Sequence, residues 1–233
     1  MDRVLIWDFD GTLGYRDGGW TGALLEIIQR EPAAPAVTSE HICPHLQAGF
    51  PWHTPDQVWS AERSAEQWWH ALYSVFERAY LAVGIDTLRA RTLAKEVRHV
   101  YTDLSHWRLF DDAIPTLSTL FMQGWSHVLL SNHVPELRAI LDHLQVSRHF
   151  AFVFNSAETG YEKPHPGAFR NVLTRLGNPA DVWMIGDSLA TDVEGAETVG
   201  IPAILVRKSH PSARYSCSDL TKLAGVLDAP LLT

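Results

Sequence analysis

Short apolar runs alternate with longer segments of helical periodicity along most of the chain. Runs dominated by apolar residues and bounded by polar turns are typical of strands buried on both faces of a sheet. Such runs lie at Val4–Trp7, His127–Leu130, Phe152–Phe154, Val182–Ile185 and Ala203–Val206. The segments of helical periodicity are Ala113–Gln123, Pro135–Leu144, Gly167–Leu176 and Val193–Val199. This alternation predicts right-handed βαβ units, and therefore an α/β fold with a parallel sheet flanked by helices.

Residues 15–108 break the alternation. The segment contains no convincing buried strand, and a Pro- and His-rich section from Pro32 to Pro55 interrupts it. Its helical stretches are Gly22–Arg30, Ala65–Val83 and Leu88–Leu104. We therefore predict an α-helical domain at 15–108, inserted into a core that comprises residues 1–14 and 109–233.

The inserted segment is rich in aromatic and metal-binding residue types. It holds most of the tryptophans of the chain, and most of these are expected to pack in its hydrophobic core. They are Trp20, Trp52, Trp59, Trp68, Trp69 and Trp107. His41, Cys43 and His45, with His53 nearby, invite a zinc interpretation, but their spacing matches no common structural zinc site.

The first apolar run leads directly into two carboxylates. Asp8 would lie at the carboxyl end of the strand, where open parallel sheets bind ligands, and Asp10 can face the same pocket. Gly11 lets the backbone approach an anion closely. A carboxylate nucleophile beside a carboxyl acid/base is a route to covalent phosphoryl transfer. Taken alone, the segment is also compatible with a strand followed by an acidic turn.

Three later segments carry complementary polar groups. Ser131 and Asn132 end the second apolar run and offer a hydroxyl and an amide to a phosphate oxygen. Lys163 precedes a proline in a loop, and Asp187 and Asp192 follow the strand at Val182–Ile185. In order and in type, the four segments resemble the motifs of the haloacid dehalogenase superfamily, which are DxDGT, S/TN, KP and GDSxxxD.

The resemblance implies a Rossmann-like core with the Asp8 strand at its centre and the Asp187 strand beside it. The insertion then corresponds to a helical cap that closes over the active site, with Gly14, Gly18 and Gly19 as candidate hinge positions. The activity implied is that of a phosphatase, which hydrolyses the phosphoric monoester of a small metabolite.

The resemblance also assigns the reacting groups and the cofactor. Asp8 would be the nucleophile that forms an aspartyl-phosphate, and Asp10 the general acid and base, whose pKa must then rise toward the working pH. Mg²⁺ would be held by Asp8, Asp187 and the backbone carbonyl of Asp10, because hard carboxylate and carbonyl oxygens suit this ion.

The remaining motif residues would recognise the phosphoryl group. Thr12, Ser131 and Asn132 would donate hydrogen bonds to its oxygens, and Lys163 would neutralise one of them. Asp192 would orient Lys163 or a metal-bound water, unless it only caps the helix that follows. His133, directly after the second motif, either lines the pocket or lies in a solvated loop.

Composition narrows the partners and the compartment. The chain has 233 residues and a net charge of −8, from 27 acidic and 19 basic residues, which argues against nucleic acid or an anionic membrane as the main partner. Cys43 and Cys217 are best read as a reduced pair, although an isolated disulfide is the alternative. The apolar start is too short for a signal peptide, and no stretch approaches the roughly 20 apolar residues of a membrane span, so we expect a cytoplasmic protein.

Other functions share parts of this pattern. A sugar phosphomutase has the same motifs, and a non-catalytic phospho-ligand binding protein would keep the fold. A 2-haloacid dehalogenase would use the same nucleophile without a metal, but it has no need of Asp10, because a halide leaves without a proton. The sequence indicates neither the substrate nor the oligomeric state.

Overall fold

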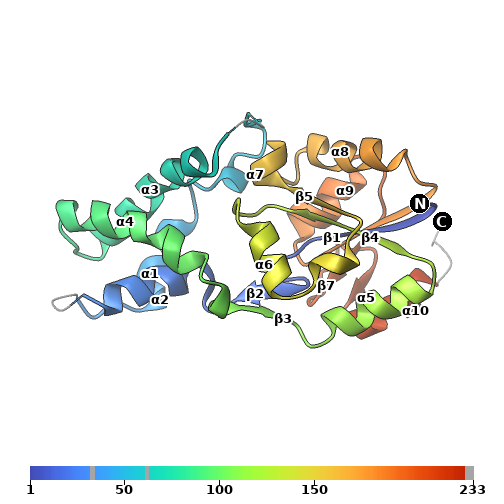
Figure 1. The fold of residues 1–233 in the computed structure, drawn as a ribbon, viewed down its shortest axis with the longest axis horizontal. Coiled ribbons are helices and arrows are strands. Elements are labelled where there is room, and N and C mark those ends of the chain that lie inside the picture. Colours follow the sequence, from blue (N-terminus) through green and yellow to red (C-terminus); the bar gives the residue numbers. More distant parts are fainter. Residues whose placement is uncertain (32–34, 61–62, 229–233) are drawn as a thin grey trace.

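The computed structural model describes residues 1–31, 35–60 and 63–228; Pro32, and residues 229–233 of the predicted core, lie outside these ranges. The centre of the molecule is a six-stranded parallel sheet with the order β5-β4-β1-β6-β7-β8 (Figure 1). Its strands are β1 (Arg3–Trp7), β4 (Ser126–Ser131), β5 (Phe152–Asn155), β6 (Asp181–Gly186), β7 (Ala203–Val206) and β8 (Ser216–Cys217). The Asp8 strand is interior and the Asp187 strand is its neighbour, which confirms the predicted fold class and strand order.

Side chains of β1 alternate between two packed layers, as expected for a strand buried on both faces. Val4 and Ile6 join the cluster that packs under α8 and α9, whereas Leu5 and Trp7 join the cluster under α5, α6 and α10. The core helices are α5 (Ala113–Met122), α6 (Leu137–His143), α7 (Ser156–Thr159), α8 (Pro166–Leu176), α9 (Gly195–Glu197) and α10 (Leu223–Leu227). Short 3-10 turns lie at η4 (Ser147–His149) and η6 (Leu220–Lys222).

The helix predicted at Val193–Val199 forms differently. A π-helical segment, η5 (Leu189–Glu194), precedes the short α9, and Ser188 caps it by accepting a hydrogen bond from the Thr191 amide at 3.3 Å. Asp192 therefore lies inside the helical turn and does not cap it. The interpretation of Asp192 as a helix cap is wrong, because Ser188 occupies that position.

In the described part of the segment between β2 and β3, called the cap below, four α-helices lie together beyond one end of the sheet (Figure 1). They are α1 (Gly19–Gln29), α2 (Ser39–Ile42), α3 (Ala65–Ala82) and α4 (Thr87–Tyr101), with 3-10 turns η1 (Cys43–Leu46), η2 (Pro51–His53) and η3 (Leu104–His106). Ser64 and Gln67 form a capping box at the start of α3, and Asp86 caps α4, which explains why these helices begin close to their predicted positions.

A two-stranded antiparallel ribbon joins the cap to the core. It pairs β2 (Gly14–Arg16) with β3 (Trp107–Leu109). The prediction that 15–108 contains no convincing buried strand did not anticipate these two short, partly buried strands at its ends. These strands are too short to show a hydrophobic period, and they form because the two connections run side by side. Arg16 anchors the ribbon to the end of α4 by donating to the carbonyls of Val100 at 3.0 Å and Tyr101 at 3.2 Å.

The predicted hinge positions after β2 have unusual backbone geometry. Gly18 and Gly19 have φ angles of 68° and 54°, in the left-handed region that glycine enters most easily. Movement of the cap about these residues stays a prediction.

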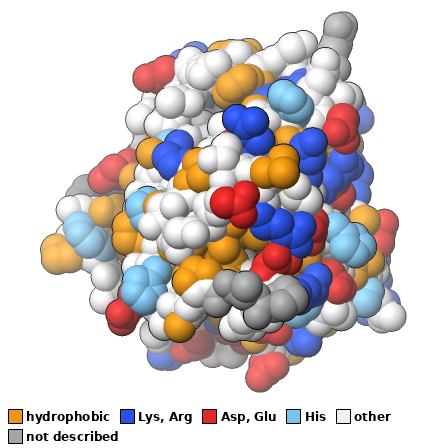
Figure 2. Space-filling view, turned by 90° about the vertical axis from the view of Figure 1, so that its left-hand side faces the viewer, with side chains coloured by type: hydrophobic (Ala, Val, Ile, Leu, Met, Phe, Trp, Pro, Cys, Tyr) orange, Lys and Arg blue, Asp and Glu red, His pale blue; other side chains and the backbone are white. Residues whose placement is uncertain are grey.

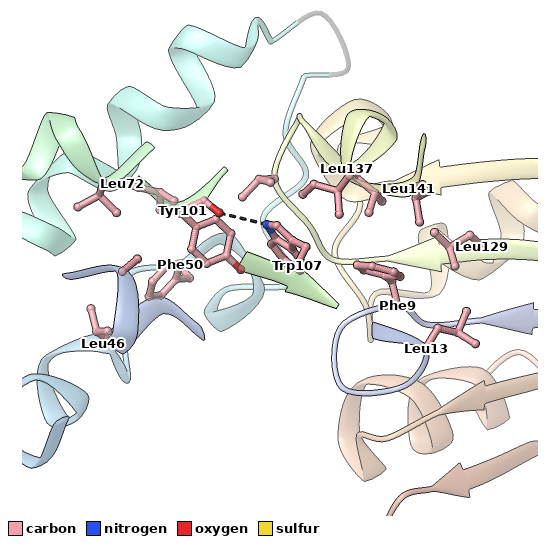
Figure 3. Close-up of a cluster of buried hydrophobic side chains, with 14 of the residues drawn as sticks. Phe9, Leu13, Leu46, Phe50, Leu72, Tyr101, Trp107, Leu129, Leu137 and Leu141 are labelled. Carbon is pink, nitrogen blue, oxygen red and sulfur yellow. Dashed lines mark hydrogen bonds between the residues drawn. The ribbon is translucent and has the colours of Figure 1, made fainter. Parts of the chain in front are cut away.

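One apolar cluster runs from the cap into the core (Figure 3). Trp107 is its bridge, with its ring centroid 5.6 Å from that of Tyr101 and 5.9 Å from that of Phe9. Five of the six tryptophans in residues 15–108 belong to this cluster or pack against it, and Trp59 is the sixth. Trp20 and Trp52 are only half-buried, so part of each side chain is accessible outside this cluster.

The surface carries mixed charge at the cap end. Figure 2 looks at that end and shows acidic and basic side chains interspersed with polar and apolar ones. Both cysteines are free, as predicted. Among the described residues, no helix combines the length and the apolar character needed to cross a bilayer.

Candidate active site

A buried lysine joins two of the predicted carboxylates at the carboxyl edge of the sheet. Lys163 Nζ lies 2.7 Å from Asp8 Oδ1 and 2.6 Å from Asp192 Oδ1, and all three side chains are at least nine-tenths buried. Burial alone would lower the pKa of Lys163, but the charges of Asp192 and Asp8 outweigh it and raise that pKa. The ammonium is therefore a fixed positive charge between two acids.

The loop that carries Lys163 is held by Asn132. The Asn132 side-chain amide donates to the Lys163 carbonyl at 2.8 Å and accepts from the Lys163 amide at 2.7 Å. These two bonds connect the carboxyl end of β4 to the lysine loop. The structure thus brings Asn132 to the site and gives it a positioning contact that the sequence did not indicate.

Asp187 completes a group of three carboxylates. Among the described residues, Asp8, Asp187 and Asp192 are the one set of at least three His, Cys, Asp or Glu residues whose candidate ligand atoms all lie within 4.8 Å of one another. The described part of the Pro- and His-rich cap section contributes no such set, so it does not support the zinc interpretation. His41 and His53 instead accept hydrogen bonds from the amides of Thr38 and Phe50.

Hydrogen bonds divide the three carboxylates into two kinds. Both oxygens of Asp192 are engaged, one by Lys163 and the other by the Ser188 amide at 3.0 Å. Asp8 Oδ1 accepts from Lys163 and from Ser131, and Asp187 Oδ2 pairs with Lys208 at 3.0 Å. No hydrogen bond from the described residues reaches Asp8 Oδ2 or Asp187 Oδ1. These two hard oxygens are the ones available to a divalent cation, which fits Mg²⁺.

Asp10 has an environment that favours its protonated form. The Asp10 side chain is exposed to the cavity that it lines, and the walls of that cavity enclose it. This enclosure, followed by the negative charges of Asp8 and Asp187, raises the pKa of Asp10 to about 7. A carboxyl group with a pKa near neutrality can both give and take a proton at physiological pH. Asp10 lines the same cavity as Asp8.

Two residues predicted to donate hydrogen bonds to the phosphoryl group, Ser131 and Thr12, are less accessible from the cavity. Ser131 is buried and donates to Asp8 Oδ1 at 3.2 Å. Thr12 is fully buried, does not line the cavity, and its hydroxyl has no partner among the described residues. Arg207 holds the Thr12 carbonyl at 2.9 Å, so the residue contributes to the shape of the turn.

Two glycines leave room for the carboxylates. A Cβ on Gly186 would lie 2.3 Å from the Asp192 carboxyl carbon, and a Cβ on Gly11 would lie 2.9 Å from that of Asp187. Such distances do not occur between packed atoms. The glycines of the first and last motifs are thus needed by the neighbouring acids as well as by the backbone.

The carboxylates open into a cavity of about 330 Å³ between the core and the cap. Asp8, Asp10 and Asp187 lie on the core side, and Trp20, Trp52 and Tyr101 line it from the cap side. His133 also lines the cavity and is 3% exposed, so it is not a solvated loop residue.

Some of these residues were missed by the sequence analysis. Tyr101 ends α4 and carries no local signal, because its place depends on how the cap docks. Lys208 had a signal: it follows the predicted strand Ala203–Val206, and carboxyl ends of parallel strands meet at one edge.

Comparisons with known proteins identify the family of the chain. A family model for haloacid dehalogenase-like hydrolases matches residues 3–200. The human haloacid dehalogenase-like hydrolase domain-containing protein 3 is 32% identical over 221 residues, which cover 88% of this chain and 81% of that protein. The phosphoserine phosphatase of Thermus thermophilus is 34% identical over 149 residues, 63% of this chain and 59% of that protein. The chain spans about three fifths of the length of several curated relatives that it matches.

A solved structure shows the same fold over nearly the whole chain. The hydrolase YfnB of Bacillus subtilis, in a crystal form bound to magnesium, superposes with a TM-score of 0.77 and 19% sequence identity. The superposition covers 97% of this chain and 99% of that one. Core and cap together therefore follow a known architecture.

Proposed function

Since the chain belongs to the haloacid dehalogenase-like hydrolases and has phosphatase homologues, we propose that it is a Mg²⁺-dependent phosphatase of a small phosphorylated metabolite. Residues 1–14 and 109–233 would be its catalytic core and 15–108 its cap. The observation that carries the proposal is that two neighbouring carboxylates at the sheet edge, Asp8 and Asp10, have different environments. Asp8 has one oxygen held by Lys163 and one free, and Asp10 beside it has a pKa of about 7.

Asp8 is the nucleophile in this proposal. One of its carboxylate oxygens attacks phosphorus, the bond to the alcohol oxygen breaks, and an aspartyl-phosphate forms. Lys163 and Ser131 both donate to Asp8 Oδ1, so the carboxylate keeps a fixed direction. Mg²⁺, held by Asp8, Asp187 and the Asp10 carbonyl, would offset the negative charge of the phosphoryl oxygens.

Asp10 moves the proton in both steps. It donates to the departing alcohol and then takes a proton from the water that attacks the aspartyl-phosphate, so it ends each cycle protonated. Lys163 and the second amide hydrogen of Asn132 would contact the phosphoryl group. Asp192 acts through Lys163, since both of its oxygens are already engaged. The role of Asp10 also argues for phosphate esters over haloacids, because a halide needs no proton.

Release of inorganic phosphate from an aryl phosphate tests the proposal. We expect chelation of divalent cations to abolish turnover and added Mg²⁺ to restore it, while circular dichroism stays unchanged. Undiminished turnover after chelation would contradict the metal requirement. Transfer of phosphate between sugar positions without its release would instead indicate a phosphomutase.

A further inference from the structure

The cap side of the cavity presents aromatic ring surface. Trp52 stacks on Phe50 through one face, with centroids 4.7 Å apart and planes at 14°. Among the described residues, its other ring neighbours, Trp20 and His53, are tilted or edge-on to it, and the half-buried side chain lines the cavity. Trp20 stacks on Tyr101 at 3.6 Å beside it, which fixes this wall in place. A flat ring entering the cavity would therefore meet a rigid, apolar surface.

The cavity lining offers no spare positive charge. Lys163 is its one Lys or Arg residue among the described residues, and two carboxylates already pair with it. Arg16 lies behind Tyr101, buried, with its guanidinium bound to backbone carbonyls. Lys208 is outside the lining and pairs with Asp187. A second acidic group on the substrate would enter this cavity unpaired, at a large desolvation cost.

A buried histidine supplies neutral polarity instead. Neither ring nitrogen of His133 has a well-formed hydrogen bond among the described residues, and the backbone of Val134 offers the ring only a weak polar contact. The rings of Phe9 and Trp107 pack against it, with centroids 5.7 Å and 5.1 Å away. An unpartnered polar group in a cavity wall is costly unless a ligand satisfies it.

We infer that the substrate is a phosphoric monoester of a small alcohol that carries a flat aromatic ring and no second acidic group. The inference rests on the proposed function, and it names the substrate class of the same site. The ring would stack on Trp52, and a polar atom near the ring would bind His133. A cavity of about 330 Å³ suits one small ring system with its phosphate. Phosphoserine, the substrate named for one relative, carries a carboxylate and does not fit this class.

Three synthetic esters test separately the preference for a flat aromatic ring and the exclusion of a second acidic group. Benzyl phosphate and cyclohexylmethyl phosphate are both esters of primary alcohols and similar in size, but only the first has a flat aromatic ring. 4-Carboxybenzyl phosphate adds an acidic group to the first. We expect kcat/KM for benzyl phosphate to exceed that for cyclohexylmethyl phosphate by roughly tenfold, the scale of an aromatic stacking contact. It should also exceed that for the carboxylated ester, because the unpaired carboxylate must lose its hydration.

Variants at Trp52 assign the preference to the ring. In Trp52→Leu the ratio of benzyl to cyclohexylmethyl turnover should fall close to one, and Trp52→Phe should keep most of it. Phe121→Leu, an exposed aromatic change outside the cavity, is the matched control and should leave the ratio unchanged. Equal turnover of the two esters by the wild type, or an unchanged ratio in Trp52→Leu, would overturn the inference. A preference for the carboxylated ester would do the same.

Binding separates this inference from the proposed chemistry. Calorimetric titration of the Asp8→Asn protein with the same esters, in the presence of Mg²⁺, reads selectivity without turnover. Tighter binding of benzyl phosphate supports the inference even when the wild type hydrolyses none of the esters, in which case the phosphatase proposal alone fails. Equal binding of all three esters overturns the inference about the substrate class.

Discussion

The two sides of the cavity are built in opposite ways. On the core side, charged groups are buried at strand ends and paired with one another, as Lys163 is with Asp8 and Asp192. On the cap side, the half-buried Trp20 and Trp52 and the buried Tyr101 pack on other rings, and the described lining there carries no charge. Buried ion pairs tolerate few substitutions because one lost partner leaves an uncompensated charge. Aromatic walls tolerate exchange of one ring for another. In the proposed function, the core therefore carries out the chemistry and the cap sets the selectivity.

Replacement of the proposed nucleophile, Asp8, should reduce turnover more than any other single change. We expect Asp8→Asn to lower kcat by at least about a thousandfold, because an amide cannot attack phosphorus and binds a metal poorly. The same change at the exposed Asp142 on α6 is the control and should leave phosphate release unaltered. Activity within tenfold of the wild type in Asp8→Asn would remove Asp8 from the mechanism.

Loss of the acid/base should depend on the leaving group. Asp10→Asn is expected to slow phosphorylation by an alkyl ester about a hundredfold or more, and to affect an aryl ester less, because an aryl oxide leaves with little help from a proton. Rapid-quench kinetics isolates this step from the later hydrolysis. Equal slowing of phosphorylation by both esters would speak against a proton donor at this position.

The Gly186→Ala change tests the ion pairs of the core side without replacing any charged residue. In Gly186→Ala, the new Cβ must push the Asp192 carboxylate away from Lys163. We expect a loss of about 1–3 kcal/mol in the free energy of unfolding and a fall in kcat of up to about a hundredfold. Gly225→Ala in α10, where a Cβ meets open space, is the matched control. Wild-type kinetics in Gly186→Ala would show that the pairing of Asp192 is dispensable.

The smallest effect concerns stability and pH. Burial raises the pKa of Glu162 to about 7, and the charges of Lys163 and Arg63 offset this only in part. Below its unfolded pKa of 4.5, Glu162 is protonated in both states. As the pH rises toward 7, the unfolded chain loses that proton while the folded one retains it, so stability falls. Urea midpoints of Glu162→Gln should lack this fall, with a gain of about 3 kcal/mol at most at pH 8. Parallel pH profiles for the two proteins would contradict it.

The sequence predicted the core side of the site far better than the cap side. Asp8, Asp187 and Lys163 occupy strand ends or loops next to them, and parallel topology brings such positions together whatever the rest of the chain does. The contacts that divide Asp192 from Asp187 were not visible, since they depend on the π-helical turn at η5. The cap wall was less visible still. Trp52, Trp20 and Tyr101 are far apart in sequence, and their meeting depends on how α1, η2 and α4 dock.

Aromatic composition alone also misjudged part of the cap. Large rings are expected to pack, and Trp68, Trp69 and Trp107 are indeed buried. Trp52 packs through one face and lines the cavity as well. A tryptophan that packs through one face and lines a cavity with the rest looks the same in sequence as one that is buried on all sides. The sequence therefore could not separate a core residue from a cavity-lining one.

Covalent capture of the phosphoryl group tests the central claim most directly. The Asp10→Asn protein should react with an aryl phosphate but lack the base that hydrolyses the product, so the phosphorylated enzyme should accumulate in the presence of Mg²⁺. Acid quench and peptide mass analysis should then place one phosphoryl group on Asp8, and Asp8→Asn in the same background should carry none. A variant that releases phosphate while no peptide is phosphorylated, or one that carries the label on another residue, would contradict the account.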